Sequence, residues 1–194
     1  MKATVIFGSP RANSNTKALL DIVLKELETL GNKLDFYNVY DMKISGCRAC
    51  LACQENMSEI NCVIDDEMQP ILKSITDSDS IIIAAPVYAW GLPAPVKAVV
   101  DRMAYSSCKY YGIDPHGPSL VEGKKLYIIT SCGYPVEKGS DLLEESMIRV
   151  CKHFKMVYGG MLAKRHRNLK EPFMDEEKEV ASKEFAKTII GENL

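Results

Sequence analysis

Short runs of apolar, often β-branched residues alternate along the chain with longer stretches in which apolar residues recur every three or four positions. The short runs predict buried β-strands, and the three- and four-residue spacing predicts amphipathic α-helices. The expected strands cover residues 3–7, 34–39, 80–85, 124–130 and 156–163, and the expected helices cover residues 19–30, 68–75, 96–103, 142–154 and 176–190. Strand and helix therefore alternate five times, which is typical of a parallel sheet with helices on both faces.

Such a sheet predicts where a ligand binds. In open doubly wound sheets, ligands lie beyond the carboxyl ends of the strands, at the point where the strand order reverses. The loops that follow the first, third and fourth strands are therefore the candidate binding segments. The one long connection, residues 104–123, is aromatic and rich in turn residues but carries no motif.

Length and charge narrow the class of protein. A chain of 194 residues is expected to form a single domain over residues 1–194. Its net charge of −2, from 24 basic and 26 acidic side chains, argues against nucleic acid as a partner. The longest uncharged stretch, residues 80–96, contains proline and glycine, so no membrane span is expected. The apolar run before Gly8 is too short for a signal peptide, which predicts a cytoplasmic protein with reduced thiols.

The loop after the first strand is polar and directly precedes a helix. It carries hydroxyl, carboxamide and guanidinium groups on Ser9, Arg11, Ser14, Asn15 and Thr16. Free N–H groups at a helix start, together with hydroxyl donors, suit a phosphate group. The alternative is that Ser14 or Asn15 simply caps the helix. A nucleoside triphosphate or a Rossmann dinucleotide is disfavoured, because neither glycine-rich motif is present.

The loop after the third strand is aromatic where a solvent-exposed loop would normally be polar. It places the only tryptophan beside a tyrosine, and it suits a planar, mostly apolar ligand. The alternative is that these rings only cover the end of the sheet. The loop residues considered are Pro86, Val87, Tyr88, Ala89, Trp90 and Gly91.

The loop after the fourth strand adds Ser131, Cys132 and Gly133 at the same end of the sheet. Cys132 is expected to contact the ligand through its backbone and to have little chemistry of its own. A phosphate site at the first loop and a flat ring at the other two together describe flavin mononucleotide (FMN). Because that cofactor carries the redox chemistry itself, no catalytic side chain is assigned.

Two sequence motifs and their order along the chain resemble those of the flavodoxin-like NAD(P)H-dependent FMN reductases, over about residues 1–133. The matching segments are GSPR at 8–11 with SNT at 14–16, then APVY at 85–88 running into PAPVK at 93–97 and DR at 101–102. The resemblance implies a flavodoxin-like three-layer sandwich with a five-stranded parallel sheet in the order 2-1-3-4-5. It places the flavin phosphate on the first loop and the ring on residues 86–91 and 131–133. It also implies a homodimer or homotetramer.

Four cysteines lie close together in the sequence, at Cys47, Cys50, Cys53 and Cys62. Their spacing resembles the compact motif of the iron–sulfur flavoproteins, a branch of the same superfamily whose thiolates hold a 4Fe-4S cluster, although the gap before Cys62 departs from that motif. Thiolates are soft ligands that suit such a cluster. Two alternatives stay open: bare or redox-active thiols, and a zinc ion, which more often uses two separated Cys-x-x-Cys pairs.

Three smaller features have mainly structural interpretations. Cys108 and Cys151 are expected to be buried hydrophobes. Asp101 and Arg102 are expected to form an ion pair within a helix or at a subunit contact. The basic residues of 164–167, with Lys170, are interpreted as a solvated loop or, as a minority view, as a contact for a nicotinamide phosphate.

The function predicted from the sequence is an FMN-binding oxidoreductase that uses NAD(P)H to reduce a flavin, a quinone or a similar small acceptor. One alternative is an iron–sulfur flavoprotein that carries electrons between a ferredoxin-like donor and FMN through a 4Fe-4S cluster. A second alternative is a flavin- or thiol-based redox sensor or binding module. The fold cannot separate these functions, because one scaffold hosts many different sites.

Overall fold

The computed structural model describes residues 1–111, 116–166 and 170–191. Five parallel strands form one sheet in the order β2-β1-β3-β4-β5, which confirms the predicted α/β flavodoxin-like topology. The strands are β1 (Lys2–Phe7), β2 (Lys33–Asn38), β3 (Ser80–Ala84), β4 (Lys125–Cys132) and β5 (Val157–Arg165). Phe7 pairs with Asn38 on one side and with Ala84 on the other, so these strands end at the same edge.

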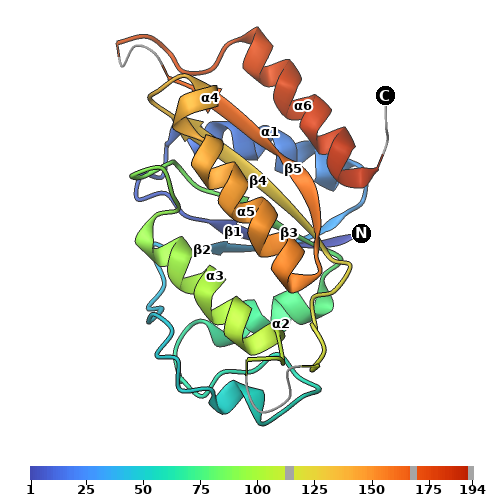
Figure 1. Cartoon of the computed structure of the whole chain (residues 1–194). Helices are drawn as coiled ribbons and strands as arrows, with labels where there is room; N and C mark the ends of the chain where they lie inside the picture. Colours follow the sequence, from blue (N-terminus) through green and yellow to red (C-terminus); the bar gives the residue numbers. More distant parts are fainter. Residues whose placement is uncertain (112–115, 167–169, 192–194) are drawn as a thin grey trace.

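Helices cover both faces of the sheet (Figure 1). The helices are α1 (Asn15–Thr29), α2 (Gln69–Asp77), α3 (Ala94–Ser107), α4 (Val136–Gly139), α5 (Asp141–Phe154) and α6 (Glu176–Ile190), with the 3-10 turn η1 (Ala52–Gln54) between β2 and α2. One apolar cluster joins α1 and α6 to the sheet, and a second joins α2, α3 and α5 to it. The fold therefore has three layers, as predicted.

The element boundaries differ from the expected ones at the edge where ligands are expected. Helix α1 begins at Asn15, four residues earlier than expected, because Ser14 caps it by accepting the amide N–H of Lys17. Strand β4 continues to Cys132, so Ser131 and Cys132 belong to a strand end instead of a loop. The short elements η1 and α4 were not predicted, since neither has an apolar repeat.

The end of β1 lies in close contact with the start of α3. A Cβ atom on Gly8 would come within 1.9 Å of Cγ2 of Val96. Only glycine lets these two elements approach so closely, and this contact brings the first loop beside the helix that follows the third loop. Within the described part of the chain, every helix is too short or too polar to cross a lipid bilayer.

Candidate functional site

Hydrogen bonds join the three predicted binding segments at the carboxyl edge of the sheet. The hydroxyl groups of Thr16 in α1 and Ser131 in β4 lie 2.8 Å apart, and both residues are buried. The carbonyl of Ser131 also accepts the amide N–H of Val87 in the third loop, at 3.2 Å. The structure thus brings the first, third and fourth segments into contact at Ser131.

The first loop presents polar groups at the start of a 15-residue helix. Ser9 is buried, and its hydroxyl accepts the amide N–H of Arg11 over a long 3.4 Å. The Arg11 side chain is exposed and forms no ion pair with a described residue. Capping by Ser14 is confirmed, and the first N–H groups of α1 have no partner inside the helix. The loop therefore combines a helix start with a guanidinium that has no ion-pair partner among the described residues.

The strand β5 contributes to this edge in a way that the sequence did not indicate. Nδ2 of Asn15 lies 2.9 Å from Nδ1 of His166, and the amide N–H of His166 donates to the carbonyl of Cys132. The guanidinium of Arg165 donates through Nε to the carbonyl of Gly133, at 3.0 Å. The only sequence signal was the basic run 164–167, of which Arg167 lies outside the described residues.

That basic run borders a polar cleft of about 460 Å³ between β5 and α6. Lys164 is not free to bind an anion there, because it pairs with Glu177 at 2.9 Å. Asp175 and Glu171 also line the cleft, so its charge is mixed. The described residues thus favour the structural interpretation of the run over a phosphate contact.

The third loop is a tight turn closed by two reciprocal bonds between Tyr88 and Gly91, of 3.0 and 2.9 Å. Its central residues, Ala89 and Trp90, have φ values of 48° and 60°. This left-handed conformation suits Asn-Gly and is strained for residues with a Cβ atom. Strain of this kind collects at functional sites, so the turn supports a binding role for the loop.

Replacing Ala89 with Gly should raise the free energy of unfolding by about 0.5–1 kcal/mol. Glycine adopts a positive φ without the steric penalty that alanine has, and the larger conformational entropy of glycine in the unfolded chain offsets only part of this gain. Chemical denaturation of the cofactor-free protein measures the change. The control is Ala18→Gly inside α1, where the same substitution should lower the free energy of unfolding by about 0.5–1 kcal/mol. A loss of stability at position 89 equal to that at position 18 contradicts a strained turn.

The exposed ring of Trp90 lies beside a second aromatic ring, that of Tyr134, which was not among the predicted ring-binding residues. Its ring stacks on Tyr134, with centroids 5.8 Å apart and planes inclined by 22°, and its indole N–H donates to the carbonyl of Lys138 at 2.9 Å. Trp90 remains 47% exposed. A pocket of about 180 Å³ lies here, lined by Val87, Ala89, Trp90, Cys132, Gly133, Tyr134 and Gly139. Tyr134 directly follows Gly133, and this aromatic position beside a predicted ring-binding residue is the sequence signal for it.

Cys132 lines this pocket and is largely buried. Burial raises the pKa of its thiol, although the charge of Arg165 acts in the other direction. A raised pKa lowers the fraction of thiolate, which is the nucleophilic form. That Cys132 contacts the ligand through its backbone and has little chemistry of its own stays a prediction.

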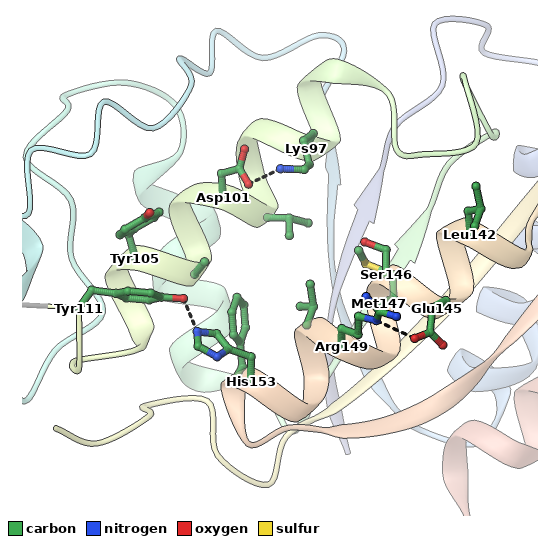
Figure 2. A pocket seen from close by; sticks show the side chains of 14 residues that line it. Lys97, Asp101, Tyr105, Tyr111, Leu142, Glu145, Ser146, Met147, Arg149 and His153 are labelled. Atoms are coloured by element: carbon green, nitrogen blue, oxygen red, sulfur yellow. Dashed lines mark hydrogen bonds and ion pairs between the residues drawn. The ribbon is translucent and has the colours of Figure 1, made fainter. Parts of the chain in front are cut away.

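A wide groove of about 600 Å³ lies elsewhere, between α3 and α5 (Figure 2). Across it, the hydroxyl of Tyr111 lies 2.5 Å from Nε2 of His153. An ion pair stands on each side, Lys97 with Asp101 on α3 and Arg149 with Glu145 on α5. None of the predicted cofactor-binding residues lines this groove, so it is separate from the candidate flavin site.

The four predicted cysteines line one pocket. Cys47, Cys50, Cys53 and Cys62 surround it together with Arg102 and Tyr105 of α3. Within the described ranges, no three Cys, His, Asp or Glu side chains converge so that they could hold a single metal ion. A 4Fe-4S cluster binds each thiolate to a different iron, so four thiols around a pocket fit a cluster better than one zinc ion.

The wall of this cysteine pocket is fixed by a buried ion pair. The side chain of Arg102 is fully buried, and its Nη1 lies 2.6 Å from Oδ2 of Asp66. Burial alone would raise the pKa of Asp66, but hydrogen bonds from Arg102 and from the amides of Ser45 and Met68 outweigh burial and lower that pKa. The expected pairing of Asp101 with Arg102 was wrong: Arg102 points to Asp66, and Asp101 pairs with Lys97.

The cysteine pocket and the flavin loops lie at different positions along α3. The third loop ends at Pro93, which directly precedes this helix, whereas the pocket contacts Arg102, Tyr105 and Ser106. At 1.5 Å per residue, these positions lie about 12–18 Å along the axis from the helix start. Within one chain, the two candidate sites are therefore separated by most of α3.

Comparison with known sequences places these sites in a family. Residues 1–162 match the family described as NADPH-dependent FMN reductase. The chain belongs to this family. The predicted resemblance is thereby confirmed, including its closest branch, because the chain is 37% identical over 139 residues to an iron–sulfur flavoprotein of Archaeoglobus fulgidus. The match covers 71% of this family member and 58% of that relative.

Other relatives agree on the branch and the fold. An iron–sulfur flavoprotein of Methanosarcina thermophila is 37% identical over 102 residues, covering 53% of this chain and 52% of the relative. The family member thus spans just over half the length of the curated relatives that it matches. An NAD(P)H:quinone oxidoreductase from Methanothermobacter marburgensis has the same fold, with a TM-score of 0.70 at 16% identity over 100% of this chain and 97% of that one.

Proposed function

We propose that this protein binds FMN and uses NAD(P)H to reduce a flavin, a quinone or a similar small acceptor. The observation that carries the proposal is the junction at Ser131, where the start of α1, the strained aromatic loop and the end of β4 meet at one edge of the sheet. Membership of the NADPH-dependent FMN reductase family supports it. A solved FMN-dependent NADH-azoreductase from Bacillus anthracis, in complex with FMN, has the same fold at a TM-score of 0.70 and 16% identity.

The residues divide into two groups in this proposal. The hydroxyl groups and Arg11 of the first loop, with the N–H groups of α1, hold the phosphate of FMN. Residues 86–91 and 131–133 line the flavin ring, and Trp90 and Tyr134 limit its access to water. When bound, FMN supplies the hydride and electron chemistry. The protein positions the cofactor, and no side chain is assigned as an acid or base.

The alternative function, electron transfer through a 4Fe-4S cluster, is supported by the cysteine pocket. Four thiols line it, and the relatives of Archaeoglobus and Methanosarcina are named iron–sulfur flavoproteins. In this alternative, Cys47, Cys50, Cys53 and Cys62 hold the cluster, and a ferredoxin-like protein is the electron partner. Assembly as a homodimer or homotetramer and location in the cytoplasm also stay predictions.

Anaerobic absorption spectroscopy separates the two functions. The purified protein is loaded with FMN and, in a parallel sample, with iron and sulfide, and each sample then receives NADPH. Bleaching of the flavin band by NADPH supports the reductase, whereas a broad iron–sulfur absorption with about four irons per chain, reduced by dithionite but not by NADPH, supports electron transfer. A protein that takes up no FMN overturns both functions.

A further inference from the structure

Two cations are buried in the described part of the chain, and both contact the segment that carries the four cysteines. Arg102 is 1% exposed and Lys109 is 0% exposed, and the buried polar residues of the described ranges include no other lysine or arginine. Arg102 donates to the carbonyls of Ser45 and Ile64, on either side of the cysteines, as well as to Asp66. The buried cations of the described residues therefore lie against the segment that carries the cysteines.

Lys109 differs from Arg102 because no carboxylate of the described residues forms an ion pair with it. Its ammonium group donates to the carbonyl of Cys53 at 2.7 Å and to Oδ1 of Asn61 at 3.4 Å. Among the described residues, no acidic side chain forms an ion pair with it. Burial lowers the pKa of Lys109, and a nearby anion would act in the other direction and favour its charged form. Within the described ranges, the chain does not supply that anion as an ion-paired carboxylate.

The position of Lys109 indicates where the anion lies. Its two partners are the backbone carbonyl of Cys53 and the side chain of Asn61, which precedes Cys62. The ammonium group therefore lies against the cysteine segment, next to the residues that line the pocket. Nε of Arg102, in the wall of the same pocket, is a buried side-chain nitrogen with no hydrogen-bond partner in the described residues. Two features, a buried lysine without an ion-paired carboxylate beside the pocket and a donor without an acceptor in its wall, therefore point to an anionic ligand in the cysteine pocket.

We propose that Lys109 is the counter-charge for a thiolate-bound cluster in the cysteine pocket and that it raises the reduction potential of that cluster. This inference rests on the iron–sulfur alternative of the proposed function. A cluster held by four thiolates is anionic, and it becomes more negative when it accepts one electron from a ferredoxin-class donor; no bond forms or breaks. The fixed positive charge of Lys109 stabilises the reduced form more than the oxidised form.

The test is the midpoint potential of the reconstituted protein. Protein loaded anaerobically with iron and sulfide is titrated with dithionite and followed by electron paramagnetic resonance. The variant Lys109→Met should lower the equilibrium constant for one-electron reduction about tenfold, which corresponds to a midpoint potential lower by about 59 mV. The variant Lys109→Arg keeps the positive charge, so its midpoint potential should be close to that of the wild type. It also provides a second comparison if Lys109→Met fails to fold.

A matched control separates the local charge from the net charge. Lys178 is also largely buried, with 14% of its side chain exposed, but it belongs to α6 on the opposite face of the sheet. Lys178→Met should leave the midpoint potential unchanged. Equal potentials for the wild type and Lys109→Met, with full iron content in both, overturn the role of Lys109 alone. If the wild type binds no iron, both the iron–sulfur alternative and the proposed role of Lys109 are overturned.

Discussion

Replacing Asp66 with Asn is expected to lower the free energy of unfolding by about 3–5 kcal/mol, because it leaves the buried guanidinium of Arg102 without a counter-charge. Asn has nearly the same shape as Asp, so the change removes the charge and keeps the packing. The side chain of Arg102 is 0% exposed and that of Asp66 is 10% exposed, so solvent screens the pair little. Denaturant titration at neutral pH measures the loss.

The same pair predicts how stability depends on pH. The pKa of Asp66 is lowered in the folded protein, so its contribution is complete above the unfolded pKa of about 3.9. That contribution is lost as the pH falls through the folded pKa. The difference between wild type and Asp66→Asn should therefore stay constant from pH 8 to about 5 and shrink below about 4.

The neighbouring acid on α3 provides the control for Asp66. Asp101 pairs with Lys97 four residues earlier in the helix, and both side chains are exposed to solvent. Asp101→Asn should change the free energy of unfolding by no more than about 0.5 kcal/mol. A loss below about 1 kcal/mol for Asp66→Asn, similar to that for Asp101→Asn, would falsify the claim that the buried pair fixes the wall of the cysteine pocket.

Replacing Arg11 with Ala should weaken FMN binding about 10- to 100-fold. This factor corresponds to the binding free energy lost when one hydrogen bond between charged groups is removed. Arg11 is exposed and has no acidic partner among the described residues, so the substitution removes no structural ion pair. Titration of the free protein with FMN, followed by quenching of flavin fluorescence, gives the dissociation constant.

Riboflavin separates the phosphate contact from contacts with the ring. Riboflavin lacks the phosphate, so its affinity should be equal in the wild type and in Arg11→Ala. The control variant is Lys25→Ala, which removes one positive charge from the exposed surface of α1 and should leave FMN affinity unchanged. If both flavins bind more weakly to Arg11→Ala, Arg11 holds the loop and does not contact phosphate.

The elements of the sheet could be predicted from the sequence because their signals are local. The run Ile81–Ile83 is buried on both faces of the sheet and forms the centre of β3 as expected. The apolar repeat of α6 gives the helix its observed bounds. Cys108 and Cys151 are buried among apolar residues, as their isolated positions indicated. In a regular repeat of apolar residues, the secondary structure depends mainly on residues that are close together in the sequence.

The candidate sites were predicted only in part, because their geometry depends on residues far apart in the sequence. The bond between Thr16 and Ser131 joins positions 115 residues apart. The stacking of Trp90 on Tyr134 depends on the turn at Ala89, whose positive φ no sequence pattern indicated. His166 reaches Asn15 only because β5 ends at the same edge of the sheet as α1 begins.

The sequence by itself determined the alternation of strands and helices, the polar first loop, the aromatic third loop and the group of four cysteines, since each is a pattern of neighbouring residues. Only the tertiary structure decided which charges are paired. In the folded chain, Arg102 forms its ion pair with Asp66 instead of Asp101. Lys109, which belongs to a connection without a sequence motif, is buried and donates to the carbonyl of Cys53. The reason is physical: burial strengthens the interaction between charges, and burial is a property of the packed chain that no local pattern specifies.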